Sequence, residues 1–204
     1  MATLNWFFKH PQEHIVVGRR RYQVTTDTAT VITVLQVLQD EWLTPLDQCQ
    51  ICLELFLGRA ARKIPSEDSG KILEQILDEL FGKAKKTSGP RALDFILDSP
   101  YIYSAFKQTY NIDLMEASSR LPWKVFLQLF ADLPDATIIK RIIAIRVRPI
   151  PAITQYNKQE VMHLMEQKTK YALPMSEEER ENAFQAGVDK LVNSLQKLAK
   201  AGEQ

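Results

Sequence analysis

The sequence lacks the groups on which most enzymes depend. It contains no GxSxG, HExxH, GxxxxGK[ST] or GxGxxG motif, so the common nucleophile, zinc and nucleotide sites have no signal here. Its three histidines are scattered: His10, His14 and His163. The carboxylates Asp94, Asp98 and Asp113 each stand beside a helix start or turn, where capping of free N–H groups is favoured over acid–base catalysis. We therefore expect no catalytic residues, no cofactor and no metal, and a protein that is not an enzyme.

Cysteine is scarce as well. The two cysteines, Cys49 and Cys52, have the spacing of a redox pair or of half a zinc site. A structural zinc site needs four ligands, and no second cysteine pair is present. A redox pair would sit at a helix N-terminus, whereas these two fall inside a predicted helix. On one face of that helix lie Leu46, Cys49, Leu53 and Phe56. We interpret them as buried free thiols, because cysteine often behaves as a small hydrophobic residue.

Neither sign of charge dominates, and long hydrophobic runs are missing. The formal net charge is +1, so no overall field draws the protein to nucleic acid or to a membrane. Local basic clusters at 19–21, 59–63, 83–86 and 140–148 alternate with acidic segments, whereas a non-specific nucleic-acid binder shows a basic excess. No stretch reaches the roughly 18 apolar residues of a membrane helix, and the first residues do not form a secretory signal. We expect a cytosolic protein that binds neither nucleic acid nor membrane.

The sequence does contain enough apolar residues for a sizeable core. Its 204 residues are 45% hydrophobic, which suits one large domain or two small ones. Only 7 glycines are present, which is few for an all-β protein. Weak alternation over residues 14–25, with a turn near Gly18, predicts a short β-hairpin. The rest has helical periodicity, so the predicted fold class is mainly α with a short N-terminal β-hairpin.

Apolar spacing, caps and breakers place the expected helices. They fall at about 27–40, 45–57, 66–81, 99–110, 121–133, 135–147, 157–171 and from residue 176 onward. Alternation over 144–148 leaves a short strand as an alternative end to the helix at 135–147. Gly, Lys and Ser at 82–90 indicate a linker. The predicted units are residues 1–81 (hairpin and three helices), residues 91–174 (a helical domain with the Tyr/Trp-rich motif) and residues 175–204 (an amphipathic helix).

Two segments concentrate apolar residues that are candidates for binding another protein. The first candidates are the rings of Tyr101, Tyr103, Tyr110 and Trp123, since aromatic side chains bury a large area at low entropy cost. The second segment carries a heptad seam in a four–three spacing: Phe184, Val188, Leu191, Leu195 and Leu198. For the rings, packing within the chain is the alternative. For the seam, docking on a partner or on a second copy and packing on its own domain both stay open.

Part of this pattern resembles a known family. The matching positions are Asp94-Phe95, Asp98, Tyr101-Ile102-Tyr103, Phe106, Tyr110, Ile112-Asp113-Leu114, Leu121, Trp123 and Ile145-Arg146. Together with a looser similarity over 17–27, they resemble the bacteriophage "gene product fifteen" family of phages and prophages of Gram-positive bacteria, over about residues 14–150. Two positions depart from the family: Asn111 stands where glycine is usual, and Lys124 stands where a second tryptophan is frequent.

The resemblance implies a function. Genes of that family lie between those for the major tail protein and the tape measure protein, the position of tail assembly chaperones in siphoviruses. It therefore implies a chaperone that binds the tape measure protein and assists assembly of the tail tube from the major tail protein. Such a protein would self-associate, act in the bacterial host cytoplasm and be absent from the mature virion. The alternatives are a structural tail component retained in the virion and, less favoured, a nucleic-acid-binding maturation protein.

Overall fold

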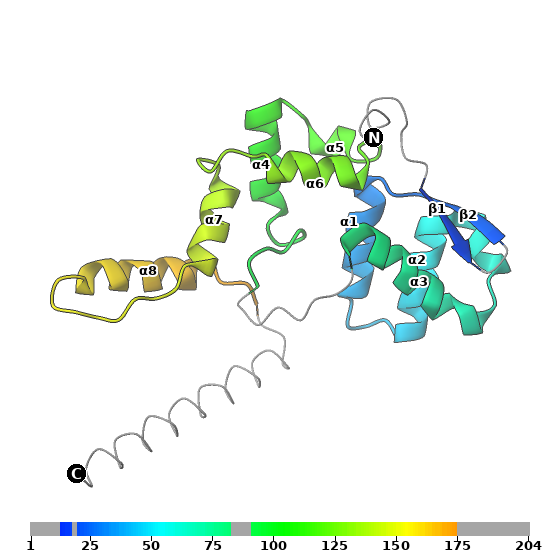
Figure 1. The fold of residues 1–204 in the computed structure, drawn as a ribbon, viewed down its shortest axis with the longest axis horizontal. Helices are drawn as coiled ribbons and strands as arrows, with labels where there is room; N and C mark the ends of the chain where they lie inside the picture. The colour runs from blue at the N-terminus through cyan, green and yellow to red at the C-terminus, as the bar shows by residue number, and fades with distance from the viewer. Residues whose placement is uncertain (1–12, 18–19, 83–90, 175–204) are drawn as a thin grey trace, which may run out of the picture.

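The structure, a computed structural model, describes residues 13–17, 20–82 and 91–174. Within these ranges the protein is mainly α-helical, and a two-stranded antiparallel hairpin precedes the helices (Figure 1). This arrangement confirms the predicted fold class. The predicted linker at 82–90, apart from Gly82, and the predicted helix after 175 lie outside the described residues, and the proposed division into units stays a prediction.

The described part of the first half, residues 13–17 and 20–82, contains the hairpin and three α-helices. Strand β1 (Glu13–Val17) pairs with β2 (Arg20–Val24), with Glu13 opposite Val24. Helix α1 (Thr28–Leu38) begins after Asp27, whose side chain accepts a hydrogen bond from the Thr30 N–H, as expected for an N-cap. Helix α2 (Pro45–Leu57), a 3₁₀ helix (Gly58–Lys63) and α3 (Ser66–Phe81) follow.

Residues 91–174 contain five helices: α4 (Ser99–Tyr110), α5 (Leu114–Ala117), α6 (Trp123–Ala131), α7 (Ile138–Val147) and α8 (Lys158–Lys170). Asn111 ends α4 in the left-handed conformation, with φ 55°, a conformation that asparagine tolerates. The alternative of a short strand at 144–148 is wrong, because α7 stays helical through Val147. Ile139, Ile142 and Arg146 show why: their spacing places all three on one buried helical face, which a strand would not do.

One hydrophobic cluster joins the two halves. It contains buried side chains of α1, α2 and α3 together with those of α4, α6 and α7. Trp123 lies within it, with ring centroids 5.6 Å from Phe81 and 5.1 Å from both Phe95 and Phe126. In Figure 1, α1 lies between the hairpin with α2 on one side and α4, α7 and α8 on the other, and one end of α3 overlaps α1 in this view. This position makes α1 a wall shared by both halves.

The cysteines lie in this cluster or against it. Cys52 is fully buried, Cys49 is partly buried, and both are free thiols. Burial, with a contribution from Cys49, raises the pKa of the Cys52 thiol to about 11. A thiol with this pKa is protonated at neutral pH and is a poor nucleophile, which supports the interpretation as core residues.

Candidate protein-docking groove

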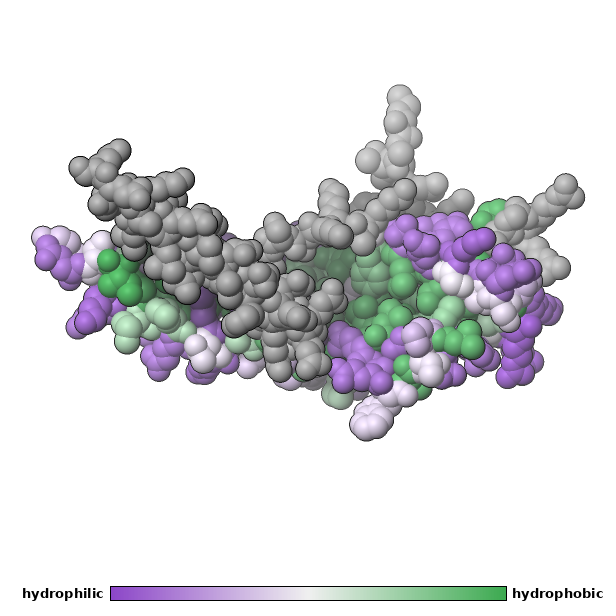
Figure 2. All heavy atoms as spheres, turned by 90° about the horizontal axis from the view of Figure 1, so that it is seen from below, coloured by the Kyte–Doolittle hydropathy of each residue, from purple (hydrophilic) through white to green (hydrophobic). Residues whose placement is uncertain are grey.

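An open groove of about 570 Å³ lies between α1, α4 and α5. Its lining residues are Thr28, Ala29, Ile32 and Thr33 of α1; Ser99, Pro100, Ile102 and Tyr103 of α4; Leu114 and Met115 of α5, followed by Ser118; and Phe95 and Phe126. None of these side chains carries a charge. Seen from below, hydrophobic residues gather in a hollow toward the middle of the molecule (Figure 2). The groove therefore suits an apolar, uncharged occupant.

The α1 wall is fixed by hydrogen bonds to the loop that precedes α6. The backbone N–H and the hydroxyl of Thr28 both donate to the Leu121 carbonyl, at 2.8 Å and 2.7 Å. The Ala29 N–H donates to the Ser118 carbonyl, and the Trp123 N–H donates to the Thr26 carbonyl. Buried polar groups that are satisfied in this way hold elements in one arrangement. The start of α1 is thus tied to the end of the groove formed by Ser118.

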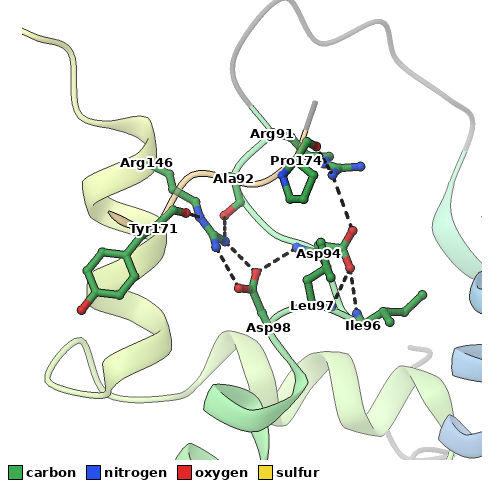
Figure 3. A network of polar contacts seen from close by, with 9 residues as sticks. All are labelled: Arg91, Ala92, Asp94, Ile96, Leu97, Asp98, Arg146, Tyr171 and Pro174. Carbon is green, nitrogen blue, oxygen red and sulfur yellow. Dashed lines mark hydrogen bonds and ion pairs between the residues drawn. The ribbon is translucent and has the colours of Figure 1, made fainter. Parts of the chain in front are cut away.

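The α4 wall is fixed by a buried ion pair (Figure 3). Arg146 of α7 donates from Nη1 to Asp98 Oδ2 at 2.6 Å and from Nη2 to Oδ1 at 2.8 Å. The exposed fractions of Arg146 and Asp98 are only 8% and 1%. The same guanidinium donates to the carbonyls of Tyr171 (2.7 Å) and Ala92 (3.1 Å). One side chain therefore joins the start of α4, the end of α8 and the segment before α4.

The carboxylates of this network also shape the turn that carries Phe95. The Asp94 N–H donates to Asp98 Oδ2 at 3.0 Å, and Asp94 Oδ1 accepts from the N–H groups of Ile96 and Leu97. The predicted capping role holds for Asp94 in this turn. It is wrong for the Asp98 side chain, which caps no N–H of α4 and pairs with Arg146 instead. Phe95 and Ser99, which line the groove, are held in place by these contacts.

A second polar contact supports the α5 wall. The Tyr103 hydroxyl donates to Asp113 Oδ2 at 3.0 Å, and Asp113 Oδ1 accepts from the Met115 N–H at 3.1 Å. Asp113 is therefore the N-cap of α5, as predicted. Desolvation raises the pKa of the Asp113 carboxyl, but hydrogen bonds from Tyr103, Met115 and Lys107 outweigh it, so the pKa lies below its usual value. The hydrogen bond to Asp113, followed by desolvation, raises the pKa of Tyr103.

The structure separates the predicted site residues. Tyr103 lines the groove, and Tyr101 is exposed at the surface outside the lining. Tyr110 packs on Phe106 and donates its hydroxyl to the Leu129 carbonyl at 2.9 Å. Trp123 is fully buried, which is the packing alternative for this ring. The seam residues lie outside the described residues: Phe184, Val188, Leu191, Leu195 and Leu198.

Sequence reasoning missed two features of the site. Arg146 did have a signal, because it is a charged residue at helical spacing from Ile139 and Ile142 on an apolar face. Met115, whose exposed fraction is 84%, had none, since an apolar side chain at a groove rim has the same local sequence signature as a core residue. Its position at the rim depends on how α5 packs.

In the described part of the chain, no group of three or more His, Cys, Asp or Glu side chains is arranged to hold a metal ion. No helix in 13–17, 20–82 or 91–174 is long and apolar enough to cross a membrane.

Comparison with known proteins identifies the family. A model of the bacteriophage Gp15 protein family matches residues 12–173. The chain therefore belongs to this family of phage proteins. The match extends further toward the C-terminus than the resemblance visible in the sequence, and it includes all the residues that line the groove. No curated protein and no solved structure matches the chain.

Proposed function

We propose that this protein is a phage tail assembly chaperone that binds the tape measure protein through the groove between α1, α4 and α5. The observation that carries the proposal is the open groove with an uncharged lining, in a chain of the bacteriophage Gp15 family. The sequence resemblance supports this choice of partner, because genes of that family lie beside the gene for the tape measure protein.

The chemistry of the groove is compatible with this partner. Tape measure proteins present long amphipathic helices, and such helices are recognised by laying an apolar face into a hydrophobic groove. Tyr103, Phe95 and Phe126 offer aromatic surface to that face. Met115 at the rim offers a flexible side chain that adapts to different contacts. Because no lining side chain is charged, the groove disfavours the polar face of the same helix, which would lose its hydration without a partner.

The remaining parts of the proposal follow from the same role. The protein acts without catalysis or cofactor, self-associates in the bacterial host cytoplasm, assists assembly of the major tail protein into the tube and leaves before the virion is complete. It contacts neither nucleic acid nor membrane.

Co-expression with the tape measure protein tests the proposal. The chaperone carries an affinity tag, and light scattering of the purified material gives the number of copies bound. We expect several copies to co-purify with the long protein and to keep it in solution. If the tape measure protein precipitates while this protein elutes alone, the proposal is wrong.

Two matched variants test the groove itself. Met115→Glu places a carboxylate at the groove rim, and Met162→Glu places the same group on the exposed surface of α8. Both methionines are exposed, so neither change opens the core. We expect Met115→Glu to lose the tape measure protein and Met162→Glu to retain it. Equal loss in both variants would move the docking surface away from the groove.

Mass spectrometry of purified virions tests the rival role as a retained tail component. We expect the protein to be absent or scarce relative to the major tail protein. A fixed number of copies in each particle would favour the structural role.

A further inference from the structure

Residues 1–8 form a second concentration of apolar residues in the sequence. Residues 1–8 read MATLNWFF, with Leu4, Trp6, Phe7 and Phe8 and no charged side chain. They lie outside the described residues and precede the family match, which begins at residue 12. The family match therefore does not include the three consecutive aromatic residues that precede β1.

The hairpin register places the first described residue of β1 at the end of the hairpin from which the chain continues into α1. Glu13, the first described residue, pairs with Val24 in an antiparallel ladder. In such a ladder the chain before Glu13 leaves the hairpin at the end where β2 continues into α1. The first turn of α1 contributes Thr28, Ala29 and then Ile32 to the groove. Phe8 precedes Glu13 by at least as many residues as separate Val24 from Thr28, so an extended segment is long enough to reach the lining.

The chemistry of the segment matches the lining. A groove of about 570 Å³ has the size of a site for a small ligand and holds a few side chains. An uncharged aromatic segment enters such a groove without desolvating a charge, and each ring buries roughly 150–250 Å². The heptad seam of the C-terminal segment matches less well, because Asp189, Lys190 and Lys197 stand among its apolar positions.

We propose that residues 4–8 fill the groove of their own molecule in the free protein, with Trp6 as the anchor. This intramolecular contact does not depend on the identity of any partner. Its consequence does rest on the proposed function, in which the tape measure protein displaces the segment. The free chaperone then does not expose an apolar groove. A partner must bind the groove tightly enough to compete with the effective concentration of the tethered segment.

The three tryptophans of the chain provide an internal scale for the test. Trp42 has an exposed fraction of 96% and Trp123 of 0%, and Trp6 is the third. The full-length protein, without any partner, is labelled with 5-fluorotryptophan. The fluorine signals are assigned with Trp6→Phe and Trp42→Phe, and their shift between H₂O and D₂O reports exposure to solvent. We expect Trp6 to be shielded, as Trp123 is, whereas Trp42 shows the full solvent shift.

Two substitutions in the lining tie the shielding to the groove. Ile32→Glu in α1 and Met115→Glu at the rim both place a carboxylate where Trp6 would pack. We expect Trp6 to acquire the solvent shift of Trp42 in each variant. The Trp123 signal reports whether the core remains folded, and Met115→Glu leaves the core intact because Met115 is exposed.

Four outcomes would overturn the proposal. If the Trp6 signal shows the same solvent shift as Trp42 in the unmodified protein, the segment does not dock. A shielded Trp6 that neither carboxylate releases places it elsewhere. Shielding that disappears on dilution means exchange between copies. If Trp6 becomes shielded only when the chain is truncated after Pro174, the C-terminal segment is the occupant, because its removal frees the groove. All four outcomes concern the free protein, whereas co-purification with the tape measure protein tests the proposed function, so failure of one proposal is distinguishable from failure of the other.

Discussion

The core around Trp123 and the groove are adjacent regions of similar composition. They differ in whether another element of the chain covers their aromatic side chains. In the core, Phe126 stacks on Phe106 and on Trp123, with ring centroids 5.1 Å apart in both pairs. In the groove, Phe126 and Phe95 again take part, but there they line an open space together with Tyr103 and Met115. Apolar composition therefore does not distinguish a core from a binding surface. The distinction depends on whether another element of the chain covers the rings.

Polar contacts explain why the groove stays open. Collapse of the walls would bury more apolar surface, which is favourable at roughly 25 cal/mol per Å². It would also require moving α1 away from Leu121, or α4 away from Arg146. Both contacts are buried or partly buried, and breaking such contacts leaves groups without partners. The groove is thus a consequence of anchors placed at the ends of its walls.

Trp123→Ala should have the largest effect on the core side of this comparison. Removing a fully buried indole that contacts Phe81, Phe95 and Phe126 should reduce the free energy of unfolding by about 3–5 kcal/mol. Urea unfolding measures the change. Trp123→Phe is the control: it keeps a ring, and it removes an indole N–H that has no acceptor among the described residues, so it should cost less. A small loss in Trp123→Ala would contradict the core role.

Asp98→Ala should cost about as much, through a polar mechanism. It leaves the Arg146 guanidinium buried with no carboxylate, and breaking a buried pair in this way costs about 3–5 kcal/mol. The double variant Asp98→Ala with Arg146→Met should recover part of the loss, because the buried charge is then gone. Arg148→Ala breaks only the exposed pair with Glu160 and should change unfolding by about 0–1 kcal/mol. Equal effects from Asp98→Ala and Arg148→Ala would argue against the ion pair as an anchor.

Tyr110→Phe should have an intermediate effect. It keeps the ring contact with Phe106 and removes the hydrogen bond to the Leu129 carbonyl, a loss of about 0.5–1.5 kcal/mol. Tyr101→Phe, at an exposed position, should stay within about 0.5 kcal/mol of the unmodified protein. Thermal unfolding compares the two. Loss of the tape measure protein in Tyr110→Phe, with stability unchanged, would show that Tyr110 contacts the partner directly.

Met115→Ala should have the smallest effect on stability and the clearest effect on the groove. Its side chain is exposed at the rim, so the free energy of unfolding should change by no more than about 0.5 kcal/mol. Retention of the tape measure protein should fall, because the flexible side chain no longer covers the bound helix. A variant that is strongly destabilised but still binds would reverse the assignment of this residue from rim to core.

The local features of the fold could be predicted from the sequence. Asp27 caps α1, Asn111 ends α4 at positive φ, and Asp113 caps α5. Each of these depends on neighbours within a few residues, where side-chain and backbone groups meet whatever the remainder of the chain does. The roles of Asp98 and Arg146 could not be predicted in this way, because the two residues are 48 positions apart and their pairing requires α7 to pack against the start of α4.

The sequence by itself determined which described segments form the longer helices, that Cys49 and Cys52 lie in the core or against it, and that the chain has the residue pattern of the bacteriophage Gp15 family. Only the tertiary structure decided which rings of the Tyr/Trp-rich motif are core and which line the groove. Trp123 and Tyr103 are both aromatic residues at helical spacing, so local periodicity predicts the same degree of burial for both side chains. What separates them is coverage by distant elements: Phe81 of α3 lies against Trp123, whereas Tyr103 faces the groove beside α1.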